Sequence, residues 1–92
     1  IEALQQAASE LGLSPAQARQ LSIDTVLGAA KLAAQSDETA CVLRERVTSK
    51  GGTTEAALRT MAERGVKEGF VAGVLAANLR GRELGELLGK DS

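Results

Sequence analysis

Apolar residues recur three or four positions apart along most of the chain, which is the spacing of a helix face. The first such segment covers residues 1–11 and is followed by Gly12, the residue type that most often ends a helix. Ser14, Pro15 and Gln17 then form the pattern of a capping box with proline in the first turn. The pattern therefore predicts a helix, a glycine stop and a second helix starting at Pro15.

Four further helices are expected by the same spacing. The one that begins at Pro15 continues to about residue 35, and the break at residues 36–38 starts a short helix that ends near Arg46. Two more are predicted over residues 55–64 and from about residue 67 to 88, separated by Gly65. No alternating strand pattern and no Asn-Gly or Asp-Gly hairpin signal occurs. We therefore predict an all-α fold, a helical bundle.

The two long helices carry apolar residues on more than one face. In the helix over residues 15–35, Leu21 and Leu32 lie opposite Ile23 and Val26. The last helix has two apolar stripes, and small residues recur in it at every fourth position: Gly65, Gly69, Gly73, Ala77, Gly81, Gly85 and Gly89. Because a single short chain cannot cover so many faces, we expect a second subunit or another domain to cover the rest.

The two shorter helices are predicted to bury one side each. The residues expected to face inward are Ala40, Leu43 and Val47 in the first, and Ala57, Leu58, Met61 and Ala62 in the second. Cys41 is expected to be a small buried apolar residue, because there is no His to activate it as a nucleophile.

Composition narrows the function classes. Ninety-two residues make one domain at most, and Ala is the most frequent residue, so large core side chains are few. A net charge of −1 and a single aromatic, Phe70, argue against a nucleic-acid partner. Without His, catalysis by His and His-ligated metal sites are excluded within the chain, and we expect no metal. Cys41 is unpaired, which fits a reducing, cytoplasmic setting.

The ends and the hydropathy of the chain add two expectations. The longest apolar run, residues 70–77, is much shorter than the ~20 residues of a membrane span, so no membrane partner is expected. The chain opens without Met, within an apolar helical rhythm, and we expect it to be a piece of a longer protein.

Residues 47–54 form the polar, glycine-rich stretch in which we expect binding chemistry. Gly51 and Gly52 precede Thr53, Thr54 and a helix start, where unpaired backbone N–H groups and the helix dipole favour an anion. The pattern suits a small carboxylate or phosphate and lacks the order of a Walker A loop. The alternative is a plain helix start, with Glu55 supplying the negative charge that the dipole favours.

Residues 43–54, with the sequence LRERVTSKGGTT, resemble the signature of pyrroline-5-carboxylate reductase. The similarity extends upstream through residues 27–32 and to the glycine stop at Gly12, and fades in the last helix. It covers nearly all of this chain but only about the last third of the family's chain. The resemblance implies that residues 1–92 are the C-terminal helical dimerisation and substrate-binding domain, with an N-terminal dinucleotide-binding domain absent from the chain.

The resemblance also implies a reaction and its site. The family transfers a hydride from NADPH or NADH to 1-pyrroline-5-carboxylate and forms L-proline in proline biosynthesis; its long helices interlock in homodimers that assemble further into rings. By position, Ser49 and Thr54 would supply hydroxyl donors, and Thr53 and Thr54 would supply N–H groups to the substrate carboxylate. The site would also contain Gly52, with Val47 near the pyrroline ring.

Three departures from the family's pattern qualify these expectations. No G-x-G-x-x-G motif follows a strand in this chain, and a Ser/Thr-rich segment that the family places before the position of Ile1 is absent. The chain alone should therefore have no catalytic or cofactor-binding residues and no activity. Many members of the family carry Pro at the position of Lys50, whose charge would instead assist a carboxylate. The alternative function is a non-enzymatic helical oligomerisation module, which would leave residues 49–54 unexplained.

Overall fold

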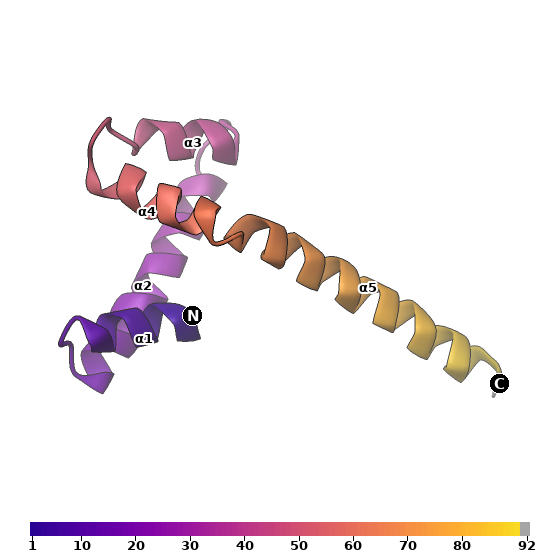
Figure 1. Cartoon of the computed structure of the whole chain (residues 1–92). Helices are drawn as coiled ribbons and strands as arrows, with labels where there is room; N and C mark the ends of the chain where they lie inside the picture. Colours follow the sequence, from indigo (N-terminus) through magenta and orange to yellow (C-terminus); the bar gives the residue numbers. More distant parts are fainter. Residues whose placement is uncertain (91–92) are drawn as a thin grey trace. The chain divides into compact units, whose positions relative to one another are not determined.

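The computed structural model describes residues 1–90 and contains five helices in that range, with no strand among them (Figure 1). They are α1 (Glu2–Glu10), α2 (Pro15–Ala34), α3 (Ala40–Arg46), α4 (Thr53–Glu63) and α5 (Val66–Lys90). The predicted all-α fold is confirmed, and residues 91–92 of the predicted domain lie outside the described residues. The chain divides into two compact units, residues 1–47 and residues 48–92.

The turn between α1 and α2 is built as the sequence predicts. Gly12 has φ +98°, the left-handed conformation that glycine adopts without strain. Its N–H donates to the Ser9 carbonyl at 3.0 Å, and the N–H of Leu13 donates to the Ala8 carbonyl at 3.1 Å. These two bonds are the Schellman motif, in which glycine ends a helix and the last carbonyls keep hydrogen-bond partners.

The capping box at the start of α2 is also confirmed. The Ser14 Oγ accepts from the Gln17 N–H at 3.2 Å, and the Gln17 Oε1 accepts from the Ser14 N–H at 3.0 Å. Pro15 occupies the first helical position, where its missing N–H leaves no bond unmade. The side chains of Ser14 and Gln17 therefore cap the N-terminus of α2.

The core of the first unit lies where α1 packs on α2, and it is made of small residues (Figure 1). Ala8, Ala18 and Ser22 are the buried residues within the described part of the chain. The Ser22 hydroxyl donates to the Ala18 carbonyl at 2.7 Å, which satisfies this buried group. Neither Ala18 nor Ser22 is predicted from the sequence to lie in the core, because both side chains are small and that of Ser22 is polar.

The second unit consists of α4 and the 25-residue helix α5, which follow each other across a turn at Gly65 (Figure 1). Gly65 has φ +68°, and its N–H donates to the Ala62 carbonyl at 3.2 Å. Its own carbonyl accepts from the Gly69 N–H at 2.9 Å, which is the first turn of α5. One glycine thus ends α4 and begins α5, as the sequence predicts.

Several burial predictions are wrong. Ala40 and Cys41 are exposed, Val47 is 59% exposed and Met61 is 48% exposed, while Leu43 and Leu58 are half-buried. Ala57 and Ala62 are exposed as well. Periodicity identifies the apolar face of a helix but not what covers it, and within its unit α3 has no extensive packing partner.

The long helices leave large apolar side chains uncovered within the described chain. On α2, four are exposed: Leu21, Val26, Leu27 and Leu32. On α5, nine are exposed: Val66, Phe70, Val71, Val74, Leu75, Leu79, Leu84, Leu87 and Leu88. This agrees with the expectation that one chain cannot cover the apolar faces of these helices. A monomeric soluble protein rarely exposes contiguous apolar surface on this scale.

None of the helices within residues 1–90 combines the length and the hydrophobicity that a membrane crossing requires.

Candidate functional site

A β-turn over residues 49–52 leads into α4. The Gly52 N–H donates to the Ser49 carbonyl at 3.0 Å, and Gly51 has φ +74°. No residue other than glycine has a positive φ in the described chain, so Lys50 has a negative one. A negative φ followed by a positive φ at glycine matches the pattern of a type II turn, which places glycine at its third position.

Gly52 is required for a different reason. It is the N-cap residue of α4 with extended backbone angles, φ −87° and ψ 179°, which any residue can adopt. A Cβ at this position, however, would overlap the Ser49 Oγ and would lie 3.1 Å from the Ser49 carbonyl oxygen. Gly51 therefore permits the turn, and Gly52 permits the close approach of Ser49.

The first turn of α4 has no side-chain cap. The first helical hydrogen bond runs from the Ala56 N–H to the Gly52 carbonyl at 3.2 Å, so the N–H groups of Thr53, Thr54 and Glu55 precede the helical ladder. No capping side chain accepts from them, because glycine has none to offer. The partial positive charge of the helix terminus and these free donors favour a bound anion.

Four of the five predicted substrate-binding residues come together at this helix start. Ser49 opens the turn and is exposed, Gly52 is half-buried at the N-cap, and Thr53 and Thr54 form the first helical residues. Thr53 is exposed and Thr54 is half-buried. The fifth residue, Val47, is the C-cap of α3 and ends the first unit.

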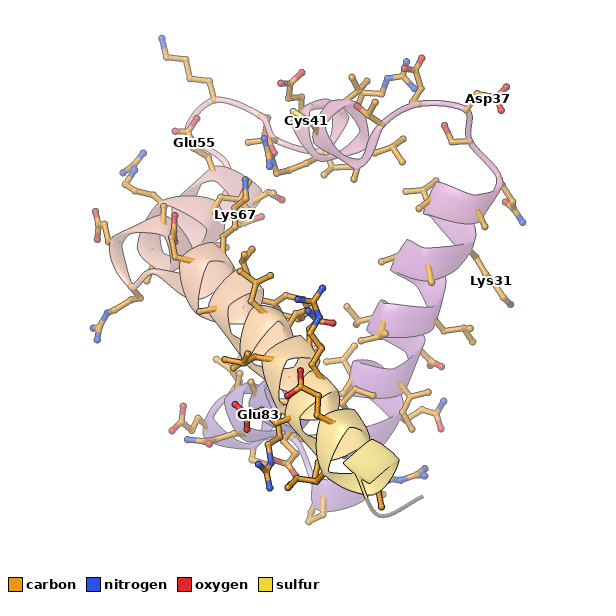
Figure 2. All side chains as sticks on the ribbon, turned by 90° about the vertical axis from the view of Figure 1, so that its right-hand side faces the viewer. Lys31, Asp37, Cys41, Glu55, Lys67 and Glu83 are labelled. Atoms are coloured by element: carbon orange, nitrogen blue, oxygen red, sulfur yellow. The ribbon has the colours of Figure 1, made fainter. Side chains whose placement is uncertain are left out.

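Glu55 anchors the turn from the helix side. Its Oε1 accepts from the Gly51 N–H at 3.2 Å and from the Arg59 Nη2 at 3.1 Å. In Figure 2 the labelled Glu55 lies in the first turn of α4, where the loop enters the helix. From the sequence, Glu55 is predicted only as a partner of the helix dipole, and its ion pair with Arg59 is not predicted. The four-residue spacing of this pair was the available signal.

The other candidate side chains make local contacts. Arg46 pairs with Glu38 at 3.0 Å, a local ion pair at the surface. Cys41, expected to be buried, is exposed; its Sγ accepts from the Arg44 Nη2 at 3.4 Å and donates to the Glu45 Oε1 at 3.5 Å (Figure 2). Arg80 pairs with Glu83 at 2.9 Å.

Within residues 1–90 no group of three or more His, Cys, Asp or Glu side chains is arranged to hold a metal ion.

The fold and the site together define a class: an all-α association domain whose long helices expose apolar faces and whose fourth helix begins with an open, glycine-built turn. A family model described as "Pyrroline-5-carboxylate reductase dimerisation" matches residues 1–84. The chain belongs to this family, as the resemblance of residues 43–54 predicts.

Individual relatives agree with this assignment. A pyrroline-5-carboxylate reductase of Pseudomonas aeruginosa is 40% identical over 90 residues, which are 98% of this chain and 33% of the relative. One of Synechocystis is 37% identical over 94% of this chain and 32% of its own. The chain therefore spans about a third of the length of the curated relatives it matches.

Two solved structures share the fold. A pyrroline-5-carboxylate reductase of Coxiella burnetii has a TM-score of 0.82 and 43% identity, over 90% of this chain and 31% of that chain. A Plasmodium falciparum pyrroline carboxylate reductase with NADP bound has a TM-score of 0.79 and 28% identity, over 83% of this chain and 30% of that chain.

Proposed function

We propose that this chain is the dimerisation and substrate-carboxylate-binding part of a cytoplasmic pyrroline-5-carboxylate reductase, an oxidoreductase of proline biosynthesis. The reaction adds a hydride from NADPH or NADH to the imine carbon of 1-pyrroline-5-carboxylate and a proton to its nitrogen, which gives L-proline. The observation that carries the proposal is an uncapped helix start, at Gly52, inside a chain of this reductase family.

The coenzyme would be held elsewhere in the protein. The Plasmodium falciparum relative has NADP bound, which supports a nicotinamide coenzyme. Residues 1–90 contain no strand and no glycine-rich strand-to-helix turn, so the described chain does not fit a dinucleotide. Reduction would therefore require a dinucleotide-binding domain outside residues 1–92, and we expect the 92-residue chain alone to be inactive.

The role of this chain in the reaction is to bind and orient the substrate through its carboxylate. The N–H groups of Thr53 and Thr54 precede the helical ladder and would donate to the carboxylate oxygens. The hydroxyls of Ser49 and Thr54 would add further donors, and Val47 would lie near the pyrroline ring. Hydrogen bonds to a charged acceptor are about twice as strong as neutral ones, so this turn would supply much of the substrate affinity.

Self-association is the second part of the proposal. The apolar side chains on α2 and α5 are exposed in the chain by itself, although they occur at helix-face spacing. We infer that a second copy covers them in a homodimer, and that such dimers assemble further into rings. Sedimentation of the natural protein should show a dimer or a larger oligomer; a stable, folded monomer would contradict this part.

The carboxylate site is tested in the natural, full-length protein with proline as the probe. Titration should shift the amide signals of Gly52 and Thr54, and unchanged signals at saturating proline would remove the carboxylate-site proposal. Thr54→Ala should raise the substrate KM about tenfold with little change in kcat, because one charge-assisted hydrogen bond is lost. An unaltered KM would exclude that role for Thr54.

The uncovered apolar faces also support a second candidate, a helical oligomerisation module without enzymatic activity. This alternative explains the exposed stripes of α5 but gives no role to the open turn at Gly52. Assay of the natural protein with 1-pyrroline-5-carboxylate and NADPH or NADH separates the two candidates. Oxidation of the coenzyme with formation of proline supports the reductase, and an oligomer without turnover or proline binding supports the module.

A further inference from the structure

We propose that Glu55 is a positioning residue for the carboxylate site: its side chain holds the turn over residues 49–52 in the conformation that leaves the N–H groups of Thr53 and Thr54 open to the substrate. This inference rests on the proposed function, and it concerns a residue outside the predicted substrate-binding set.

The contacts of a single oxygen atom carry the inference. The Glu55 Oε1 accepts from the Gly51 N–H at 3.2 Å and from the Arg59 Nη2 at 3.1 Å. The Glu55 side chain is 35% exposed and the Arg59 side chain is 66% exposed, so the pair lies at the surface beside the turn. Glu55, in the first turn of α4, thus binds the loop at the Gly51 N–H. Through Arg59 it also binds the next turn of the same helix.

The residue that Glu55 holds is the one on which the turn depends. Gly51 has the positive φ of the type II turn, which glycine adopts without strain. Because glycine also adopts many other conformations, Gly51 would leave this one easily if nothing restrained it. One backbone hydrogen bond, from Gly52 to Ser49, closes the turn across the same residues. The bond to Glu55 adds a second restraint, from the helix whose first amides would bind the substrate.

The hydrogen bond between the Gly51 N–H and Glu55 also determines which backbone N–H groups remain free to bind a ligand. The Gly51 N–H is occupied by Glu55, whereas the N–H groups of Thr53 and Thr54 have no capping acceptor. The Gly51 N–H is therefore not available to a ligand, whereas the N–H groups of Thr53 and Thr54 are.

The ion pair with Arg59 explains how the Glu55 carboxylate can lie beside a site that binds an anion. A negative charge in the first turn of α4 stabilises the helix, yet it would also repel a substrate carboxylate nearby. The guanidinium of Arg59 binds the same oxygen and offsets that charge. Loss of Arg59 should consequently weaken substrate binding less than loss of Glu55, and more at low than at high ionic strength.

The experiment compares two substitutions of Glu55 in the natural, full-length protein. Glu55→Ala removes the acceptor and should raise the substrate KM and the Kd for proline about tenfold, with kcat changed less than about twofold. Glu55→Gln keeps an acceptor oxygen for the Gly51 N–H and should restore the KM to within about threefold of the wild-type value.

The matched controls are Glu63→Ala and Glu63→Gln, the same chemical changes at the other end of α4. Glu63 makes no ion pair or side-chain hydrogen bond with the described residues of the chain. Both should leave the KM unchanged. A direct readout in the wild type is hydrogen exchange, which should be slower at the Gly51 amide than at the Lys50 amide and should become fast at Gly51 in Glu55→Ala.

The outcomes separate this inference from the proposed function. Wild-type protein that neither turns over substrate nor binds proline would end both proposals. Active wild type with an unchanged KM in Glu55→Ala would overturn the positioning role alone, as would a Glu55→Gln variant as impaired as Glu55→Ala. If Glu55→Ala does not fold, rapid exchange of the Gly51 amide in the wild type is still sufficient to overturn the inference.

Discussion

The starts of α2 and α4 differ in how the N–H groups of the first helical turn find hydrogen-bond acceptors. Both helices follow a glycine-containing turn, and both have N–H groups in the first turn that the helix itself cannot satisfy. At α2 the chain supplies the acceptors, through Ser14 and Gln17. At α4 the N-cap is Gly52, which supplies none, and the acidic side chain in the first turn is bound to the loop instead.

The helix α3 resembles α2 in this respect, since the Thr39 Oγ1 accepts from the Val42 N–H at 3.2 Å. Ser or Thr at the N-cap is the ordinary solution and stabilises a helix by about 0.5–2 kcal/mol relative to Ala. The start of α4 forgoes this stabilisation at a position where Ser would complete a capping box with Glu55. The side-chain caps of α2 and α3 stabilise the fold. Under the proposed function, the uncapped start of α4 would bind the substrate carboxylate; the start of α1, at Ile1, also has no side-chain cap.

The largest effect is expected when the start of α4 is closed like that of α2. In Gly52→Ser, the new hydroxyl can accept from the first-turn amides, and its Cβ displaces Ser49 from its place against residue 52. Both changes remove donors from the substrate, so the KM and the Kd for proline should rise more than tenfold. Steady-state kinetics and calorimetry on the natural protein measure the two quantities.

The reciprocal change at α2 is the control. Ser14→Gly opens the start of α2 and should leave the KM and proline binding unchanged, since that helix end lies outside the proposed site. If Gly52→Ser bound proline like the wild type, the open start of α4 would be irrelevant to binding and the comparison would lose its functional meaning.

A smaller effect, on stability alone, is expected from Ser14→Ala. This substitution leaves the Gln17 N–H without its acceptor and should lower the free energy of unfolding by about 1 kcal/mol. Hydrogen exchange at the first-turn amides of α2 should become faster, and the KM should not change. Denaturation must be compared at one protein concentration, because association contributes to apparent stability.

Much of this architecture follows from local sequence. Gly12, Ser14 and Gln17 form hydrogen bonds with residues three or four positions away, so a short stretch of sequence contains all the partners. The glycine pair 51–52 was likewise sufficient to predict a tight turn at a helix start. The exact start was wrong by two residues, because α4 begins at Thr53 rather than at residue 55.

Burial could not be predicted in the same way. Met61 is predicted to face inward from helix periodicity, and Cys41 is predicted to be buried because no His is present to activate it, yet both are exposed in the chain. Ser22, by contrast, is buried although it is polar. Ser22 is accommodated because its hydroxyl finds the Ala18 carbonyl and because α1 contributes the small residue Ala8. Such contacts depend on which helices meet, and periodicity within one helix contains no information about its partner.

The geometry of the turn also allows a prediction about Lys50, which occupies a position where many members of the family carry Pro. Lys50 is the second residue of the type II turn and has a negative φ, a position where Pro is common. Its N–H makes no hydrogen bond in the described structure, so Lys50→Pro removes no bond. The substitution should raise the free energy of unfolding by about 0.4–1 kcal/mol by restricting the unfolded chain.

Substrate binding by the Lys50→Pro variant tests whether the charge of Lys50 assists binding of the substrate carboxylate. If the turn geometry alone matters, the KM should stay within about twofold of wild type, and Lys50→Ala should behave the same way. An increase in KM in both variants that vanishes at high salt would instead show that the charge assists the substrate carboxylate. In that case the open start of α4 would bind its anion with a side-chain cation as well as with backbone amides, and the contrast with α2 would be one of charge as well as of capping.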